Sequence, residues 1–419
     1  MKKASIPIVL GLIGISIPFL IRTTLVSYPL QGVNSPYLTI YLYGLDILLF
    51  LIWGYLMFIT KKPPFSYGNI VDKLWVILFF YIFLRGIFTE YPLISWTYGL
   101  RFYLGISIVW YISRLQNWAK VLAFITQGFV IGMLGQSLIV IMQIILQKNL
   151  NLPLVVEPAL SPLLAGISKT ILNGDVFIRA YGTFPHPNIL AFAALMALLI
   201  VYTTVFTRKQ ASIIYGLILV SAGFIDHYLI TSIQAFVIAI LTGLYIRYGK
   251  NIQFPRWFTQ LSILALHSII LLTFSKLALI LIILLDVIYL TMLRNSQLFH
   301  MEQFQNNMRT VGRIVLRAII VGSLLITLII PYTQIVATIS KRIYYIEDAL
   351  QIITNNWFWG VGLGQYVASL PDAGREFWQF EPVHNIFLLI WSEIGLMGMA
   401  LLITIIILEY YARIYGYKR

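Results

Sequence analysis

Two stretches of the sequence combine residues that can bind an anion with a residue that can move a proton. One contains Arg179 and His186, and the other contains Arg342 and His384. The guanidinium group of arginine is always charged and binds phosphate as a fork, which suits it to a diphosphate. The imidazole of histidine titrates near neutral pH and can accept a proton from a hydroxyl group. These residue types predict a site that attracts an anion and is suited to a diphosphate.

Each stretch leads directly into an apolar segment, at Asn188 and at Asn385. A helix that begins there presents unpaired N–H groups and the positive end of its dipole to an anion. A structural alternative stays open, because asparagine is also a good helix cap and arginines can anchor a protein at a membrane surface. Lys276, between two apolar segments, could contact phosphate or only fix the turn. Gly362 belongs to a glycine-rich segment, 360–364, that is more typical of a helix stop and tight turn than of a phosphate-binding loop.

The sequence shows no metal-site spacing. His186, His384, Glu381 and Asp372 form neither a His-x-x-x-His nor a His-Glu-x-x-His pattern. Cysteine is absent, which excludes disulfides, a thiolate nucleophile and cysteine-ligated metals. We therefore expect no metal and no cofactor. Packing or capping roles are expected for two further histidines, His267 and His227, which lies beside Asp226.

The composition indicates the environment in which these residues must be positioned. Of 419 residues, 60% are hydrophobic and 11% are charged, and the mean hydropathy is +0.87. Soluble domains are about half apolar and roughly a quarter charged, and disordered chains are poor in large apolar residues. The chain is therefore predicted to be a polytopic membrane protein.

Apolar segments of about 20 residues, the length of a membrane-spanning helix, recur along the whole chain. They predict an all-α transmembrane bundle of about twelve spans, in a single integral-membrane domain over residues 1–419. We expect the first segment to be a retained span and not a cleaved signal. The predicted spans are 5–22, 37–60, 74–91, 95–113, 120–146, 187–206, 211–230, 232–248, 257–274, 276–293, 314–338 and 385–408.

The net charge of +14 is explained by topology. Most lysines and arginines fall in alternate connections between the spans, which places those connections and both termini in the cytoplasm. No nucleic-acid partner is needed to explain the charge.

The same topology puts two long connections outside, 147–187 and 339–384. Loops of this length are usually functional, and both are expected to carry amphipathic helices. In the second, a helix is predicted from Ser340, as its N-cap, to about Thr354. Its apolar residues recur at helical spacing: Ile343, Ile346, Leu350 and Ile353.

Charged residues inside predicted spans are costly in lipid and are expected to face the bundle interior or a wet cavity. Asp286 is one of them. Asp46 is another, and it could pair with either Arg85 or Arg101.

Several of these motifs together resemble the O-antigen ligase and polymerase superfamily. The resemblance is carried by the segment 342–353, by Trp359-Gly360-Val361-Gly362-Leu363-Gly364, by His384-Asn385 and by Gly395-Leu396-Met397-Gly398. Arg179 with Gly182, Pro187 and Asn188 is similar to an earlier Arg…Pro-Asn element of the family. Thr273 to Ala278 is similar to its Ser-Arg element, although Lys276 stands where the family usually has arginine.

The resemblance implies a GT-C-like membrane glycosyltransferase of polysaccharide or lipopolysaccharide biosynthesis. Such an enzyme moves a glycan from a polyprenyl (undecaprenyl) diphosphate to an acceptor hydroxyl, with inversion and without metal. It acts at the outer face of the bacterial cytoplasmic (inner) membrane. His384 is then the catalytic base. The proposed diphosphate-binding residues are Arg179, Arg342 and Lys276, and the supporting residues are His186, Asn188, Asn385 and Gly362.

Other functions stay open at this point. Polymerases, ligases and protein glycosyltransferases differ in their acceptor, which is a glycan, a lipid or a protein, and the residues named above serve all three. A transporter or flippase of an anionic substrate is the main alternative. Broken spans in corresponding halves of the chain would favour it, but the sequence shows no convincing internal repeat. A membrane protein without chemistry would leave the two cationic outer loops unexplained.

Overall fold

The computed structural model is mostly helical, with 66% helix, and divides into two compact units. Unit 1 comprises residues 1–21 and 116–335, and unit 2 comprises residues 22–115 and 336–419. The structure describes residues 5–19, 21–66, 68–112, 118–153, 155–164, 167–172, 174–203, 206–225, 233–249, 254–295, 332–371 and 374–414.

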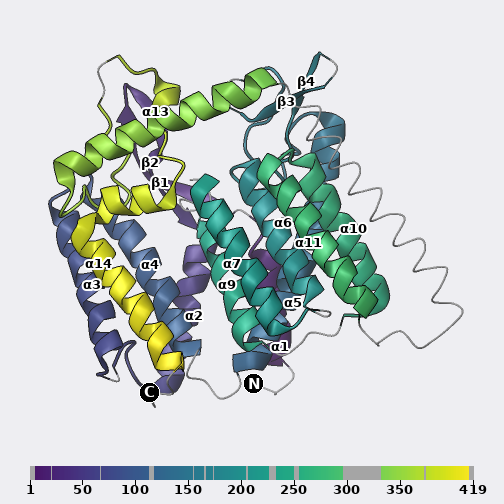
Figure 1. The fold of residues 1–419 in the computed structure, drawn as a ribbon, viewed down its shortest axis with the longest axis horizontal. Coiled ribbons are helices and arrows are strands. Elements are labelled where there is room, and N and C mark those ends of the chain that lie inside the picture. The colour runs from purple at the N-terminus through teal and green to yellow at the C-terminus, as the bar shows by residue number, and fades with distance from the viewer. Residues whose placement is uncertain are drawn as a thin grey trace, which may run out of the picture. The chain divides into compact units, whose positions relative to one another are not determined.

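The helices of unit 1 pack around α6, whose residues are nearly all buried. A helix that is apolar on every side belongs in the centre of a bundle, and α6 contacts α5, α9, α10 and α11. The neighbouring helices run roughly alongside one another (Figure 1). The described helices of this unit are α1 (Ser5–Ser16), α5 (Trp118–Leu146), α6 (Pro187–Tyr202), α7 (Arg208–Ile225), α9 (Ile233–Tyr248), α10 (Arg256–Leu272) and α11 (Lys276–Asn295).

Glycines let α1 and α5 approach each other at backbone distance. A Cβ atom added at Gly14 would lie 2.0 Å from the carbonyl oxygen of Ile125, and one at Gly128 would lie 2.0 Å from that of Gly11. Small residues at such spacing are typical of close helix pairs in membranes.

A buried polar network joins α6, α10 and α11. The Tyr202 hydroxyl donates to Asp286 Oδ1 (2.7 Å), and His267 Nε2 lies 2.9 Å from Asp286 Oδ2. His267 Nδ1 faces the Ile263 carbonyl oxygen at 2.6 Å. The carbonyl only accepts, so Nδ1 donates to it, and the other ring nitrogen faces the carboxyl group of Asp286. Asp286 therefore faces the bundle interior as expected, and His267 has the packing role predicted for it.

Unit 2 begins with a β-hairpin, which corrects the prediction of an all-α chain with a span from residue 37. Strand β1 (Arg22–Leu30) pairs antiparallel with β2 (Val33–Tyr43), and α2 (Gly44–Thr60) begins only after it. Prolines at 29 and 36 disfavour helix, and alternating aromatic and β-branched residues favour a strand. Asp46 then fixes the helix start, because its carboxylate accepts the N–H of Tyr43 at 3.0 Å.

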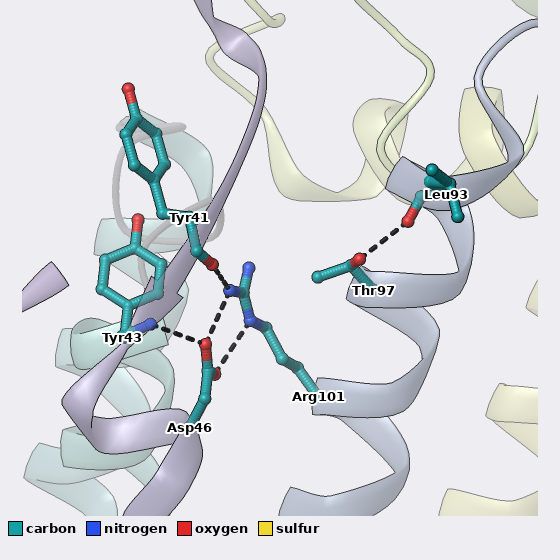
Figure 2. A network of polar contacts seen from close by, with 6 residues as sticks. All are labelled: Tyr41, Tyr43, Asp46, Leu93, Thr97 and Arg101. Atoms are coloured by element: carbon teal, nitrogen blue, oxygen red, sulfur yellow. Dashed lines mark hydrogen bonds and ion pairs between the residues drawn. The ribbon is translucent and has the colours of Figure 1, made fainter. Parts of the chain in front are cut away.

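Arg101 of α4 (Pro92–Ile112) is the partner of Asp46, so one of the two predicted pairings is confirmed (Figure 2). Its Nε donates to Asp46 Oδ1 at 2.9 Å and its Nη2 to Asp46 Oδ2 at 2.7 Å. The same Nη2 donates to the Tyr41 carbonyl oxygen at 2.6 Å, which ties the hairpin to α4. The alternative partner, Arg85 of α3 (Ile70–Ile87), donates instead to the carbonyl oxygen of Gly360.

Helix α14 (Ile386–Ile414) is broken at Gly395, where φ is 63°. The segment 357–362 satisfies the backbone groups that the break exposes. The N–H groups of residues 361 and 362 donate to the carbonyls of residues 392 and 393, and those of residues 396 and 397 donate to the carbonyls of residues 357 and 358. The Tyr81 hydroxyl lies 2.8 Å from the carbonyl oxygens of both Trp359 and Ile394. A kinked helix can be kept in an apolar environment only when such groups are paired.

Helix α13 (Tyr332–Asn356) lies across the direction of α3, α4 and α14 (Figure 1). It contains the predicted helix 340–354 but begins at Tyr332, so Ser340 lies inside the helix and is not its N-cap. The predicted apolar residues Ile343, Ile346 and Leu350 are exposed. The buried face carries Tyr345, Asp348, Ala349, Ile352 and Ile353.

The first long connection contains a β-hairpin where an amphipathic helix was expected. Strands β3 (Lys169–Leu172) and β4 (Asp175–Ile178) pair antiparallel, and the described part of 147–187 contains no helix before α6. Threonine and isoleucine favour strand conformation, and Gly174, with φ of 93°, allows the tight turn.

Two described helices are long and apolar enough to cross a membrane, Ala119–Leu146 and Ile386–Glu409. Helices also occupy the other predicted spans that the structure describes, although several are shorter than 18 residues. Most of the predicted span 314–338 lies outside the described residues, as do Asp226, His227 and Asp372.

The contact between segment 357–362 and the α14 break predicts that Gly360 cannot be replaced. Gly360 has φ of 68°, and an added Cβ would lie 2.4 Å from the Glu393 carbonyl oxygen. We expect Gly360→Ala to lower the free energy of unfolding by roughly 1–3 kcal/mol from backbone strain alone, measured by thermal unfolding of the purified protein. The matched control is Gly54→Ala in α2, where an added Cβ meets nothing within 4 Å. Equal stability of the two variants would contradict the packing described.

Candidate active site

In unit 1, Arg179 follows β4 and is held by two oxygen acceptors. Its Nε donates to the Thr273 carbonyl oxygen at 2.6 Å, and its Nη2 donates to Asn188 Oδ1 at 2.7 Å. The next residue, Ala180, donates its N–H to the carbonyl oxygen of Leu272 at 3.0 Å. Arg179 therefore joins the end of α10 to the first turn of α6. As a whole residue, Arg179 is half-buried.

His186 is the N-cap of α6. Its Nδ1 accepts the N–H of Asn188 at 3.2 Å, so the neutral ring carries its proton on Nε2, which lies 3.0 Å from Ser168 Oγ. The ring also makes an edge contact with Tyr181. His186 thus caps α6 and contacts Asn188, and Asn188 in turn fixes the guanidinium group of Arg179.

Lys276 is the first residue of α11 and is exposed. It lies on the same tight connection as Thr273, whose carbonyl accepts Arg179, and Phe274 between them has φ of 47°. The structure therefore brings Arg179 to the connection that carries Lys276.

Glutamines of α5 hold the segment that follows Arg179, and sequence reasoning missed them. Gln143 accepts the N–H of Gly182 at 2.8 Å and donates to its carbonyl at 2.8 Å. Gln136 accepts the N–H of Thr183 at 3.0 Å and donates to its hydroxyl at 2.8 Å. Both glutamines are fully buried. Their spacing in the sequence could have indicated this role, because two glutamines seven residues apart in an apolar helix lie on the same face and must point inward.

In unit 2, α13 and the loop before α14 form a cationic and aromatic cluster. Lys341 Nζ lies 3.1 Å from Glu381 Oε2, and the Tyr345 hydroxyl donates to the same oxygen at 3.1 Å. The ring of His384 stacks on Tyr345 with a centroid distance of 5.3 Å and an interplanar angle of 24°. Tyr345 is 1% exposed, so it gives His384 a fixed surface. Sequence reasoning missed this role of Tyr345.

The hydrogen bonding of His384 suits a proton acceptor. Nδ1 lies 3.2 Å from the Pro382 carbonyl oxygen, which only accepts, so Nδ1 carries the proton and the neutral ring keeps its lone pair on Nε2. Burial lowers the pKa of His384 below its ordinary 6.5, and the charges of Arg342 and Lys341 lower it further. The Pro382 carbonyl and Glu381 act in the opposite direction. Arg342 lies on α13 three residues before Tyr345, on which the His384 ring stacks.

A buried ion pair attaches the loop before His384 to α13. Arg375 donates to both carboxylate oxygens of Asp348, and both side chains are 7% exposed. These bonds raise the pKa of Arg375. The Arg375 carbonyl also accepts Gln31 Nε2 at 2.8 Å, which joins the loop to the β1–β2 turn. The position of His384 is thus constrained from both ends of its loop.

Asn385 and Gly362 have structural roles. Asn385 Oδ1 accepts the N–H groups of Phe387 and Leu388 at 2.9 and 3.1 Å, so it caps α14. Gly362, with φ of 106°, donates its N–H to the Glu393 carbonyl at 2.8 Å in the segment that pairs with the α14 break. Segment 360–364 is therefore the tight turn that the sequence favoured.

Comparison with known protein families finds a match over part of the chain. Residues 231–403 match the family model of O-antigen ligase. The matched region includes Lys276, Arg342, Gly362, His384 and Asn385, and Arg179 precedes it. No curated protein and no solved structure matches the chain.

The contacts of His384 predict how its titration responds to its neighbours. The pKa of His384 should lie below 6.5. It should fall further in Glu381→Gln, which removes a negative charge, and rise in Arg342→Gln, which removes a positive charge. NMR of histidine-labelled protein measures this, with the His384 signal assigned by its loss in His384→Gln. A pKa at or above 6.5 in the unmodified protein would contradict the burial of this ring.

Proposed function

We propose that this chain is a membrane enzyme that transfers a glycan from a polyprenyl diphosphate to an acceptor hydroxyl group, because residues 231–403 match the family model of O-antigen ligase. The observation that carries the proposal is the placement of His384, with its lone pair on Nε2, beside the cations of α13. A proton acceptor next to fixed positive charge suits a reaction in which a hydroxyl loses a proton and a diphosphate gains charge.

The proposed reaction is one displacement. Nε2 of His384 takes the proton of the acceptor hydroxyl, whose oxygen forms a bond to the anomeric carbon of the glycan. The bond from that carbon to the diphosphate breaks, and its electron pair stays on the diphosphate oxygen. Attack from the opposite side inverts the anomeric centre. The lowered pKa of His384 keeps the ring neutral at physiological pH, which is the form that accepts a proton.

Stabilisation of the departing diphosphate is assigned to cationic side chains. The proposed diphosphate-binding residues are Arg342, which belongs to unit 2, and Arg179 and Lys276, which belong to unit 1. No metal ion is proposed. Preorganised donors of this kind stabilise charge that develops in the transition state. Arg179 already has its guanidinium plane fixed by two acceptors, so little reorganisation is needed.

The setting proposed for this reaction is the outer face of a bacterial cytoplasmic membrane. We propose about twelve spans in a GT-C-like arrangement, with both termini in the cytoplasm. The acceptor, a lipid, a glycan or a protein, separates ligase, polymerase and protein glycosyltransferase. The transporter alternative is less favoured, because the family match is to a ligase.

Replacing His384 tests the base. We expect His384→Ala to reduce transfer by about 10²–10⁴-fold, the usual contribution of a general base, while the protein stays folded in the membrane. Purified protein is incubated with a polyprenyl-diphosphate glycan and each acceptor class in the presence of a chelator, and glycan and carrier are followed separately. Gln351→Ala, at an exposed position of α13, is the control. Wild-type transfer by His384→Ala would remove His384 as the base.

Two substitutions of Arg342 test the fork geometry. Arg342→Ala and Arg342→Lys should both reduce transfer, by about 10²–10³-fold for loss of a transition-state donor, because lysine supplies charge without the planar pair of N–H groups. The same assay measures both variants. Activity restored by lysine would show that a point charge is sufficient.

A further inference from the structure

A separate cavity of about 480 Å³ opens in unit 2 where α3 and α13 end. Figure 1 shows these two helix ends beside each other. The cavity is lined by the last turns of both helices and by the segment that pairs with the α14 break. Its lining residues are Tyr81, Leu84, Arg85, Phe88, Asn355, Asn356, Trp357, Phe358, Trp359 and Gly360.

The cavity carries one positive charge, and no acidic residue lines it. The hydrogen bonds that orient Arg85 all go to main-chain carbonyl oxygens. Nε and Nη2 donate to the Gly360 carbonyl at 3.1 and 2.7 Å, and Nη1 donates to the Phe88 carbonyl at 3.0 Å. A guanidinium group has five N–H donors, so these three bonds orient it without using all of its capacity. The amides of Asn355 and Asn356 line the same cavity.

The rim of the cavity is apolar and aromatic. Phe88 is 72% exposed, Trp357 55%, Trp359 53% and Leu84 44%. Tryptophan is enriched at membrane–water interfaces, where its ring meets both headgroups and alkyl chains. A fixed guanidinium beside such a rim suits a molecule with an anionic head and an alkyl tail, because arginine binds phosphate through paired N–H groups.

We propose that this cavity binds the phosphate headgroup of a membrane amphiphile, with its alkyl chains along Leu84 and Phe88. The cavity is separate from the cluster around His384. Asn355 follows Tyr345 by ten residues of one helix, which is about 15 Å along its axis. The headgroup bound at Arg85 is therefore not the diphosphate proposed to react beside His384. The proposal rests on the chain lying in a membrane and does not depend on glycan transfer.

Charge substitutions at Asn355 test the proposal without disturbing Arg85. Asn355 is exposed at the end of α13 and lines the cavity. Native mass spectrometry of the purified full chain titrated with phosphatidylglycerol or phosphatidylcholine measures the lipid affinity. Phosphatidylglycerol should bind more tightly. Asn355→Asp should weaken it about fivefold and Asn355→Lys should strengthen it by a similar factor, as expected for unit charges a few ångströms apart near water.

The matched control is the substitution Asn34→Asp. Asn34 is exposed on the β1–β2 hairpin, so this variant should bind phosphatidylglycerol like the unmodified protein. Arg85→Gln should lose the preference for the anionic lipid, and its thermal unfolding is measured in parallel because Arg85 also holds Gly360. Equal binding of the two lipids, or Asn355 variants that both behave like Asn34→Asp, would overturn the proposal.

Competitors then identify the source of the phosphate group. Displacement of phosphatidylglycerol by polyprenyl phosphate assigns the cavity to a polyprenyl carrier that is bound away from His384. Displacement by another anionic phospholipid, but not by polyprenyl phosphate, assigns it to a lipid of the bilayer. Both results support a phosphate headgroup site. Inorganic phosphate should compete only at much higher concentration, since it lacks the alkyl chains, and equal potency would contradict the role of the apolar rim.

Discussion

The proposed chemistry depends on the fixed orientation of one imidazole ring. His384 is stacked on the buried ring of Tyr345, and its Nδ1 is directed at the Pro382 carbonyl. Together these contacts set the tautomer and the direction in which Nε2 points, and burial beside two cations keeps the ring neutral. A base held in this way loses little entropy when it meets a hydroxyl group.

The remainder of unit 2 keeps that ring in place. Asp348 and Arg375 attach the loop to α13, and Asn385 caps the helix that follows His384. Helix α14 is broken at Gly395, yet its exposed backbone groups are paired with segment 357–362, so the break is rigid. Because that same segment lines the cavity at Arg85, the cavity and the break in the helix that follows His384 share one structural element.

Long apolar segments predicted most of the helices, because a helix that crosses a membrane needs about 20 consecutive apolar residues. The hairpin at residues 22–43 was missed because its apolar residues read as the start of a span, although Pro29 and Pro36 argued against helix. Residue types that can bind phosphate or move a proton suggested Arg179, Arg342 and His384 as site residues, and that assignment stays a prediction. Tyr345 stacks on His384, and the glutamines of α5 hold the segment that follows Arg179; these contacts join distant parts of the chain, and only tertiary packing shows which residues meet. Asn385 shows why a residue type alone does not assign a role, because asparagine can cap a helix or contact a substrate equally well.

The most direct test is an experimental structure of the protein with an acceptor and an unreactive polyprenyl diphosphate bound. The proposed mechanism predicts Nε2 of His384 about 2.6–3.2 Å from the acceptor hydroxyl, with the guanidinium of Arg342 against the diphosphate. An acceptor hydroxyl out of reach of His384, or a diphosphate bound away from Arg342, would contradict it.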